Sequence, residues 1–284
     1  PGRAEGRTVS AHAGRGADRR MEARSAEAPG ATVLDVKGVS KRFGGLQALA
    51  EVGITIRHGE VYGLIGPNGA GKTTFFNVIT GLYTPDGGSF ELAGRPYRPS
   101  AVHEVARQGI ARTFQNIRLF PEMTALENVM VGRHVRTRSG LFGAVFRTPG
   151  FKAEEAAIRQ RAEELLEYVG IGRYAEYRAR TLSYGDQRRL EIARALATDP
   201  KLIALDEPAA GMNATEKVVL RELIDRIRRD GRTILLIEHD VKLVMGLCDR
   251  VTVLDYGRQI AEGTPAEVQR NEKVIEAYLG AGQH

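Results

Sequence analysis

The stretch GPNGAGKTT, residues 66–74, matches the phosphate-binding pattern G-x-x-x-x-G-K-[ST] in full. It follows the apolar run VYGLI (61–65) and precedes the helical pattern TTFFNVITGL, which is the strand-to-helix setting that this motif requires. Gly66, Gly69 and Gly71 let the backbone curl so that successive N–H groups point at phosphate oxygens. The segment therefore predicts a phosphate-binding turn that ends at a helix N-terminus, whose dipole attracts anions.

Two side chains of this segment add chemistry that the backbone lacks. Lys72 can reach the β- and γ-phosphates of a nucleoside triphosphate, and the Thr73 hydroxyl can ligate magnesium. A glycine-rich turn without a ligand is the alternative, and the pattern together with its setting disfavours it. The predicted nucleotide-binding residues are Gly66, Pro67, Asn68, Gly69, Ala70, Gly71, Lys72, Thr73 and Thr74.

A second motif, LIALDE at residues 202–207, places two acids at the end of an apolar strand. Ligands of open α/β sheets bind at the carboxyl edge of the strands, where these side chains would lie. We expect Asp206 to hold magnesium, directly or through water, and Glu207 to polarise an attacking water as a general base. An acidic pair alone is a weak signal, but beside the phosphate-binding loop it indicates nucleotide hydrolysis.

Strand-like apolar runs alternate with helical patterns along most of the chain. Several of the runs are uniformly apolar, as strands buried on both faces are, and apolar residues recur in the helical patterns at a spacing near 3.6 residues. This alternation predicts an α/β fold with a parallel or mixed sheet flanked by helices. It fails at 124–181, where helical patterns predict a subdomain inserted into the α/β core, and residues 1–30 read as a disordered basic extension.

Composition narrows the class of protein. The net charge is +6, but residues 1–30 hold six arginines and four acids, and the remaining charge is dispersed rather than gathered in a stripe that could follow nucleic acid. No apolar run approaches the roughly 20 residues of a membrane-spanning helix. The single cysteine, Cys248, is read as core filler in a reducing compartment.

The order of the remaining motifs indicates which family of nucleotide hydrolases the chain resembles. The segment LSYGDQRRLEIARAL, then LIALDEP and LLIEHD, resembles the ATP-binding cassette (ABC) ATPases from about residue 33 to 280. The resemblance implies a P-loop NTPase core with an antiparallel β portion, spanning residues 31–280, and ATP and Mg²⁺ as ligands. It also implies that Phe43 stacks on adenine, Gln115 senses magnesium and the γ-phosphate, and His239 supports hydrolysis. Each of these three residues also has a purely structural interpretation. Phe43 could be a buried aromatic, Gln115 a polar residue on an edge strand and His239 a helix cap.

The same resemblance implies that LSYGDQRRL, residues 182–190, contacts the nucleotide bound by a second ATPase subunit. Two such cassettes face each other, and Ser183 with the backbone N–H of Gly185 would close on the nucleotide of the partner, at a helix beginning near Asp186. The segment departs from the commonest family motif, LSGGQ, at Tyr184 and Asp186. Asn213 also stands where an aspartate is usual in the family.

Within the family, the segments EPAAGMN, LLIEHDVKLVMGLCDRVTVLDYGRQIAEGTP and VIEAYLG resemble the ATPase subunits of branched-chain amino-acid importers, as does the loop at 136–151. The alternatives are a lipopolysaccharide-export ATPase and a soluble cassette that acts on nucleic acid. The former has a shorter helical insert, and the latter would show long heptads or a second cassette. A nucleotide kinase fits less well, because no acceptor-binding lid is visible.

The importer resemblance implies the partners. It predicts a second ATPase subunit, two transmembrane permease subunits, an extracytoplasmic substrate-binding protein that acts indirectly, and no nucleic acid. The chain would be cytoplasmic and peripheral on the inner face of the cell membrane. The apolar group Leu119, Phe120 and Met123, expected to be exposed, is the predicted docking point for a permease helix. Scattered surface or core hydrophobes are the alternative reading.

Overall fold

A computed structural model of the chain describes residues 30–134 and 149–280. The predicted extension before residue 30 and most of the loop at 136–151 lie outside the described residues.

The centre of the fold is a largely parallel sheet. Six strands of the described residues form it in the order β10-β9-β3-β8-β7-β6. Neighbouring strands run parallel except β10, which pairs antiparallel with β9 at the edge. Because non-sequential strands are neighbours, the chain must cross over through helices. The strands are β3 (Val61–Ile65), β6 (Ile110–Arg112), β7 (Leu202–Asp206), β8 (Thr233–Ile237), β9 (Arg250–Asp255) and β10 (Arg258–Gly263).

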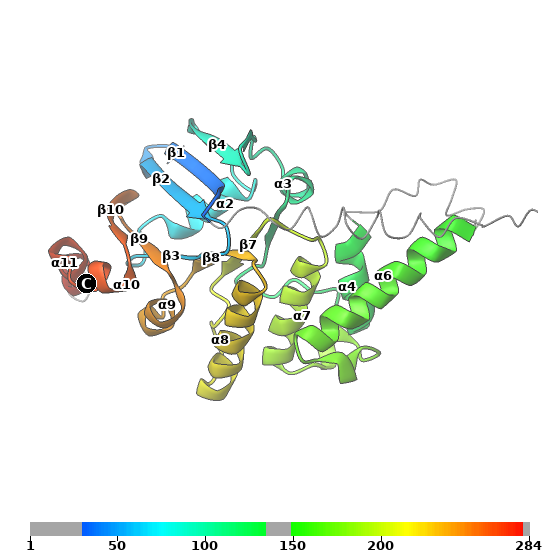
Figure 1. Ribbon diagram of the computed structural model, residues 1–284. Coiled ribbons are helices and arrows are strands. Elements are labelled where there is room, and N and C mark those ends of the chain that lie inside the picture. The colour runs from blue at the N-terminus through cyan, green and yellow to red at the C-terminus, as the bar shows by residue number, and fades with distance from the viewer. Residues whose placement is uncertain (1–29, 135–148, 281–284) are drawn as a thin grey trace, which may run out of the picture.

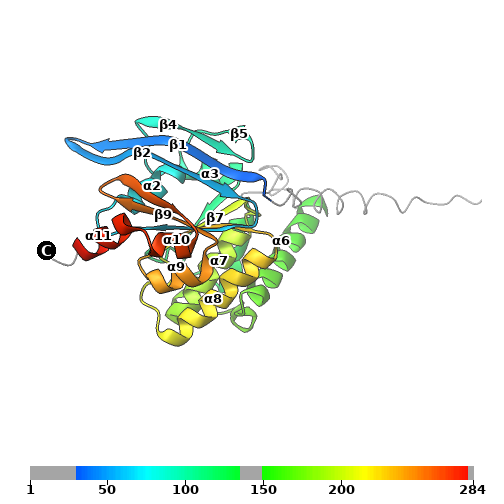
Figure 2. The same ribbon diagram turned by 60° about the vertical axis from the view of Figure 1, so that its left-hand side comes forward.

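A second, antiparallel sheet lies over one face of the first, at the top of Figures 1 and 2. Its strand order is β2-β1-β4-β5, with bounds Thr32–Phe43 for β1, Leu46–Arg57 for β2, Gly87–Leu92 for β4 and Arg95–Pro96 for β5. Helices α2 (Lys72–Ile79) and α3 (Val102–Gln108) accompany it. This is the antiparallel portion that the family resemblance implies.

Alternation along the central strands divides the interior into two cores. In β8, Ile234 and Leu236 face a core shared with the large helices, whereas Leu235 and Ile237 face α2 and the antiparallel sheet. Successive side chains of a strand point to opposite faces, so a strand covered on both sides must be apolar throughout. The uniformly apolar runs of the sequence therefore have a direct structural reason.

Helices cover the opposite face of the central sheet, below it in Figures 1 and 2. They are α7 (Tyr184–Leu196), α8 (Ala214–Arg229) and α9 (Val241–Leu247). Farther out lie α4 (Ala125–His134) and α6 (Pro149–Tyr168), followed by the 3₁₀ turns η1 (Gly172–Tyr174) and η2 (Ala179–Thr181). The described residues end in α10 (Pro265–Gln269) and α11 (Glu272–Gly280), beside β10.

The α/β fold expected from the sequence is confirmed, and the boundaries at 31–280 and 124–181 stay predictions. Cys248 is buried in the helix-side core, where burial raises the pKa of its thiol and keeps it protonated. Within residues 30–134 and 149–280, no helix is both long and apolar enough to cross a membrane.

Candidate functional site

The loop between β3 and α2 depends on glycine at the backbone level. Gly66, Gly69 and Gly71 have φ values of 151°, 79° and 99°, in the region that side chains disfavour. A Cβ at Gly66 would lie 2.1 Å from the carbonyl oxygen of Leu254, and one at Gly71 would lie 2.8 Å from that of Ala48. The loop is thus packed tightly against neighbouring backbone, and substitution at either glycine would displace it.

Lys72 is folded back into this loop. Its buried ammonium donates to the carbonyl oxygens of Gly66 at 2.6 Å and Pro67 at 2.9 Å. Burial lowers the pKa of this ammonium, and the charge of Glu207 opposes that shift. The cation is therefore held inside the phosphate-binding loop, close enough to Glu207 to feel its charge.

The turn between β9 and β10 braces the outer part of the loop. The N–H of Gly257 donates to Ala70, and its carbonyl accepts from Ala50. Asn68 and Thr73 are exposed and Thr74 is half-buried, so the polar groups of the loop face outward while Ala70 is packed inward.

Asp206 ends β7 as a buried carboxylate. Its oxygen lies 3.6 Å from the Arg112 guanidinium, and its N–H donates to the Thr113 hydroxyl at 3.3 Å. Burial raises the pKa of Asp206 to about 6, with Arg112 opposing the shift. A carboxylate that is costly to ionise in this position would gain from a divalent cation.

Magnesium fits the donors available here. A carboxylate from Asp206, a hydroxyl from Thr73 and an amide oxygen from Gln115 are the hard oxygen ligands that magnesium prefers, with phosphates and water completing the octahedron. In the part of the chain that the structure describes, no group of three or more His, Cys, Asp or Glu side chains could hold a metal.

Arg112 is a site residue that the sequence reasoning missed. Its guanidinium lies over the rings of Phe76 at 4.7 Å and Phe114 at 4.3 Å, and it donates to the Thr80 hydroxyl at 2.7 Å. It supplies the positive charge opposite Asp206. The sequence did offer a signal for it, because Arg112 is a charged residue within the otherwise apolar run GIARTF.

Glu207 follows β7 with a strained backbone. Its φ of 43° lies in the left-handed region, which is unusual for a residue with a Cβ, and its N–H donates to the Ile237 carbonyl at 2.9 Å. Its carboxylate accepts from Gln115 Nε2 at 2.8 Å and lies 3.4 Å from His239 Nδ1. The structure thus brings together the predicted catalytic residues Gln115, Glu207 and His239, and strained backbones of this kind concentrate at functional sites.

Glu238 is a second residue that the sequence reasoning passed over. It is fully buried beside His239, 3.9 Å from Nδ1, and its Oε1 accepts from the Ala209 N–H at 2.8 Å. Its Oε2 is buried and has no hydrogen-bond partner, and burial raises the pKa of the carboxyl. The acid in LLIEHD was visible, but a buried acid cannot be told from an exposed one by sequence.

Phe43 lies at the exposed end of β1. The residue is 42% exposed, and its ring meets that of Tyr83 edge to face with 5.2 Å between the ring centroids. An exposed aromatic ring held by a second ring offers a surface on which a base can stack.

The segment at 182–190 supplies the cap and the first turns of α7. Ser183 caps α7, its hydroxyl accepting from the Asp186 N–H at 3.2 Å and donating to the Asp186 carboxylate at 2.8 Å. The helix begins at Tyr184, earlier than the expected start near Asp186. The reason is that Ser183 is the capping residue, so the residue directly after it is already helical. Across the described residues, no hydrogen bond or ion pair joins Ser183 or Gly185 to residues 66–74.

Gly185 and Tyr184 pack against the start of α8. A Cβ at Gly185 would lie 2.9 Å from Glu216 Oε1, so glycine permits this close approach. The ring of Tyr184, 42% exposed, lies over Gly211, and its hydroxyl accepts from Arg188 at 3.2 Å. Asn213 forms a capping box with Glu216 at the start of α8.

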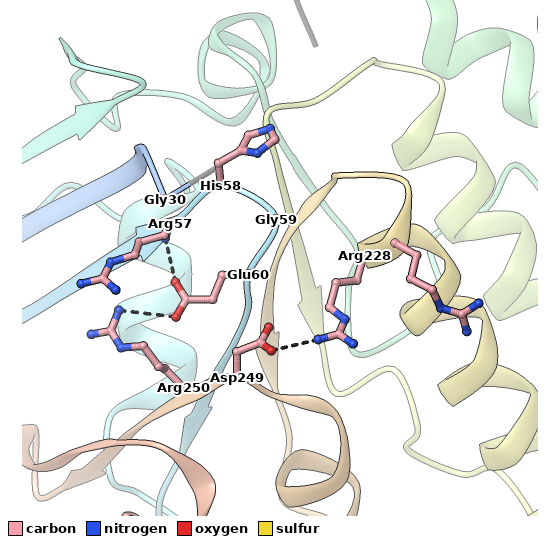
Figure 3. A pocket seen from close by; sticks show the side chains of 9 residues that line it. Gly30, Arg57, His58, Gly59, Glu60, Arg228, Asp249 and Arg250 are labelled. Carbon is pink, nitrogen blue, oxygen red and sulfur yellow. Dashed lines mark hydrogen bonds and ion pairs between the residues drawn. The ribbon is translucent and has the colours of Figure 1, made fainter. Parts of the chain in front are cut away.

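An open cavity of about 580 Å³ lies at the other end of the sheet (Figure 3). It adjoins Glu60, directly before β3, whereas the phosphate-binding loop follows the end of that strand. Figure 3 shows two ion pairs among its lining residues, Glu60 with Arg250 and Asp249 with Arg228. This cavity is therefore separate from the cluster around Glu207.

Comparison with known proteins gives consistent matches over the described fold. The family profile described as "ABC transporter" matches residues 49–210, and the one described as "Branched-chain amino acid ATP-binding cassette transporter" matches residues 258–284. The chain is 48% identical over 249 residues to the "High-affinity branched-chain amino acid transport ATP-binding protein LivG" of Salmonella typhimurium, covering 87% of this chain and 98% of the relative.

More distant matches bear on the alternatives and on assembly. The "Lipopolysaccharide export system ATP-binding protein LptB" of Escherichia coli is 33% identical, with 87% of this chain and 97% of the relative covered. The ADP conformation of MJ1267, an ATP-binding cassette of an ABC transporter, has a TM-score of 0.76 at 33% identity over 88% of this chain and 99% of that one. A dimeric cassette, MJ0796 bound to ADP and Pi, has a TM-score of 0.69 at 27% identity over 82% and 98%.

Proposed function

This chain belongs to the ABC transporter ATPases, and we propose that it is the ATP-hydrolysing subunit of an importer for branched-chain amino acids. Members of this family bind nucleotide and hydrolyse ATP to drive transport. The substrate class rests on the 48% identity to the Salmonella transport protein, against 33% for the lipopolysaccharide-export protein, and on the C-terminal family match.

The observation that carries hydrolysis is the cluster around Glu207. Gln115, His239 and Glu207 come from different segments, and their side chains meet within hydrogen-bonding reach or close to it. A general base needs such fixed placement before it can activate water. Glu207 would take a proton from the attacking water, and His239 would hold the carboxylate and approach the γ-phosphate.

The phosphate-binding loop would receive the triphosphate at the N-terminus of α2. Lys72 would exchange its bonds to the Gly66 and Pro67 carbonyls for the β- and γ-phosphate oxygens. Asp206, Thr73 and Gln115 would hold magnesium, which when bound supplies positive charge against the β,γ-oxygens. Phe43 would stack on the adenine.

The proposed partners follow from Ser183 and Gly185, at the start of α7. Within the described residues, no hydrogen bond or ion pair joins Ser183 or Gly185 to residues 66–74, and Ser183 is exposed, which suits a nucleotide held by a second cassette, of the same or a related chain. Two permease subunits in the membrane and an extracytoplasmic substrate-binding protein would complete the importer. The chain would then lie in the cytoplasm on the inner face of the membrane.

The proposed permease contact is smaller than the sequence suggested. Phe120 and Met123 are 45% and 37% exposed, but Leu119 is half-buried and packs on the helix-side core. The expectation that all three are exposed was therefore wrong at Leu119, whose side chain contributes to the core behind the other two. Phe120 and Met123 remain as the proposed surface for a permease helix.

Uptake of labelled leucine, isoleucine and valine tests the function. A strain lacking this chain should lose the uptake and regain it with the wild-type chain. Glu207→Gln should fail to restore it, because turnover falls by roughly 10² to 10⁴ while ATP still binds. Glu222→Gln, which changes an exposed acid on α8, is the matched control. Restoration by Glu207→Gln would remove Glu207 from the mechanism, and unchanged uptake in the deletion strain would refute the substrate class.

A further inference from the structure

An ion pair is buried inside α7, one turn after the helix begins at Tyr184. Arg188 is fully buried and Glu191 is 1% exposed, with 2.9 Å between Nη1 and Oε2. Burial raises the pKa of Glu191, and Arg188 opposes the shift. Because removing two charges from water costs about as much as their attraction returns, such a pair is poorly explained by stability alone.

The pair forms hydrogen bonds to the backbone at and around Gln115. Arg188 donates from Nη1 to the Phe114 carbonyl at 2.6 Å and from Nη2 to the Gln115 carbonyl at 2.8 Å. Glu191 Oε1 accepts from the N–H groups of Phe114 at 3.3 Å and Arg118 at 3.4 Å. A planar guanidinium can hold two carbonyls in fixed relation, which a lysine ammonium does less well.

The side chain of Gln115 projects from this clamped backbone to Glu207, 2.8 Å from Nε2 to Oε2. The ring before it is held too, since Phe114 lies between the guanidinium groups of Arg112 and Arg118, each 4.3 Å from its centroid. The backbone at residues 114–118 is therefore fixed, and small movements there would carry the Gln115 amide away from Glu207.

The same guanidinium reaches the exposed start of α7. Arg188 Nη2 also donates to the Tyr184 hydroxyl at 3.2 Å, and the Tyr184 ring lies over Gly211 in the segment that follows Glu207. Contacts at the start of α7 thus connect through one buried side chain to Gln115. The start of α7 would face the partner's nucleotide, whereas Gln115 serves the site of its own chain.

We propose that Arg188, paired with Glu191, is a positioning residue that holds Gln115 against Glu207 and links the start of α7 to the hydrolytic site of the same chain. This inference rests on the proposed ATP hydrolysis at Glu207. It assigns the buried pair a role in catalysis rather than in folding, so its removal should lower kcat even where stability is kept.

The test replaces the pair by apolar side chains of similar size. Arg188→Met with Glu191→Met removes both charges, a change that often leaves stability unaltered. In the full chain we expect unchanged ATP affinity and a kcat lower by about 10- to 100-fold, since small misplacement of a catalytic group costs that much. Arg161→Met with Glu164→Met, at an exposed pair of the same spacing on α6, is the control and should leave kcat unchanged.

A double-mutant cycle separates positioning from a structural role. If Arg188 acts through Gln115, adding the paired substitution to Gln115→Ala should lower kcat no further than either change alone. Should the paired variant fold poorly, Arg188→Lys keeps the charge opposite Glu191 but loses the two-carbonyl contact, and the same cycle applies.

The outcomes distinguish this inference from the proposed function. A wild-type chain that does not hydrolyse ATP overturns the proposed function, and hydrolysis that survives Glu207→Gln removes Glu207 from the mechanism. Hydrolysis that depends on Glu207 but stays at wild-type kcat in a stably folded paired variant overturns the positioning role alone. Independent, multiplicative losses in the cycle with Gln115→Ala overturn it as well.

Discussion

Two helix N-termini of this chain are proposed to contact phosphate, and they are built in opposite ways. The first, α2, has Gly71 before it, no capping side chain and no acid in its first turn. The second, α7, is capped by Ser183, and the Asp186 carboxylate lies in its first turn, bonded to that hydroxyl. The N–H groups of α2 are thus left for a ligand, while α7 already holds an anion of its own.

This difference separates what one chain can do alone from what needs a partner. The α2 terminus sits in a closed loop with Lys72 folded inside it, so it can bind phosphate within the monomer. At α7, the Ser183 hydroxyl accepts from the Asp186 N–H and Arg189 pairs with the Asp186 carboxylate, so that terminus has partners of its own without nucleotide. It follows that ATP should bind first at α2 and gain contact with α7 only when two cassettes close.

The largest effect is expected from Lys72→Ala. Loss of a charged contact to the phosphates should reduce ATP hydrolysis by roughly 10² to 10³ and weaken ATP binding by the dilute, monomeric chain. Ser183→Ala should leave that monomeric binding unchanged, and Lys273→Ala, at an exposed lysine, is the matched control. Nucleotide binding measured by fluorescence decides between them. Equal weakening by Ser183→Ala would break the comparison, because both termini would then act within one chain.

A mixing experiment gives the next largest effect. Lys72→Ala and Ser183→Arg are each expected to form nearly inactive homodimers, because each leaves both shared sites defective. A mixed dimer has one site with both lesions and one site that joins an intact loop to an intact α7. Hydrolysis should therefore return on mixing, to about half of the wild-type activity per mixed dimer if the sites act independently.

Differential tagging confirms that mixed dimers form in that experiment. If they form and stay inactive at every ratio, Ser183 acts on its own chain's nucleotide and the assignment of α7 to the partner is wrong. Where the physiological partner is a different ATPase, Ser183→Arg should instead reduce hydrolysis at the partner's loop.

The two termini also differ in how far sequence could predict them. The glycine pattern and Lys72 describe a local structure, so the loop and the acids at the end of β7 followed from short segments read alone. Arg188 and Arg112 escaped because their roles depend on contacts with segments far apart in sequence, and a buried charge has no local signature. The exposure assigned to Leu119 failed for the same reason, since only the tertiary fold places its side chain against the core.

The smallest effect is expected from Asp186→Asn, which tests whether the internal carboxylate of α7 opposes the partner's phosphate. The amide keeps an oxygen near Ser183 but removes the negative charge from the helix N-terminus. Charge at such a position contributes about 0.3–1 kcal/mol, so the folded monomer should lose roughly that much stability. Because phosphate would no longer face a like charge, ATP-driven dimerisation should become tighter by a factor of about 2 to 5, the same free energy in the opposite direction.

Glu267→Gln provides the control for that last measurement. Thr264 and Glu267 cap α10 as Ser183 and Asp186 cap α7, with the acid bonded to the capping residue, but α10 lies beside β10, away from the proposed nucleotide site. Its substitution should reduce stability similarly and leave dimerisation unaltered. Thermal unfolding gives the first quantity, and light scattering at graded ATP concentrations gives the second. If Asp186→Asn weakens dimerisation, the carboxylate helps to form the phosphate site instead of repelling the phosphate. The difference between α2 and α7 would then rest only on the Ser183 cap.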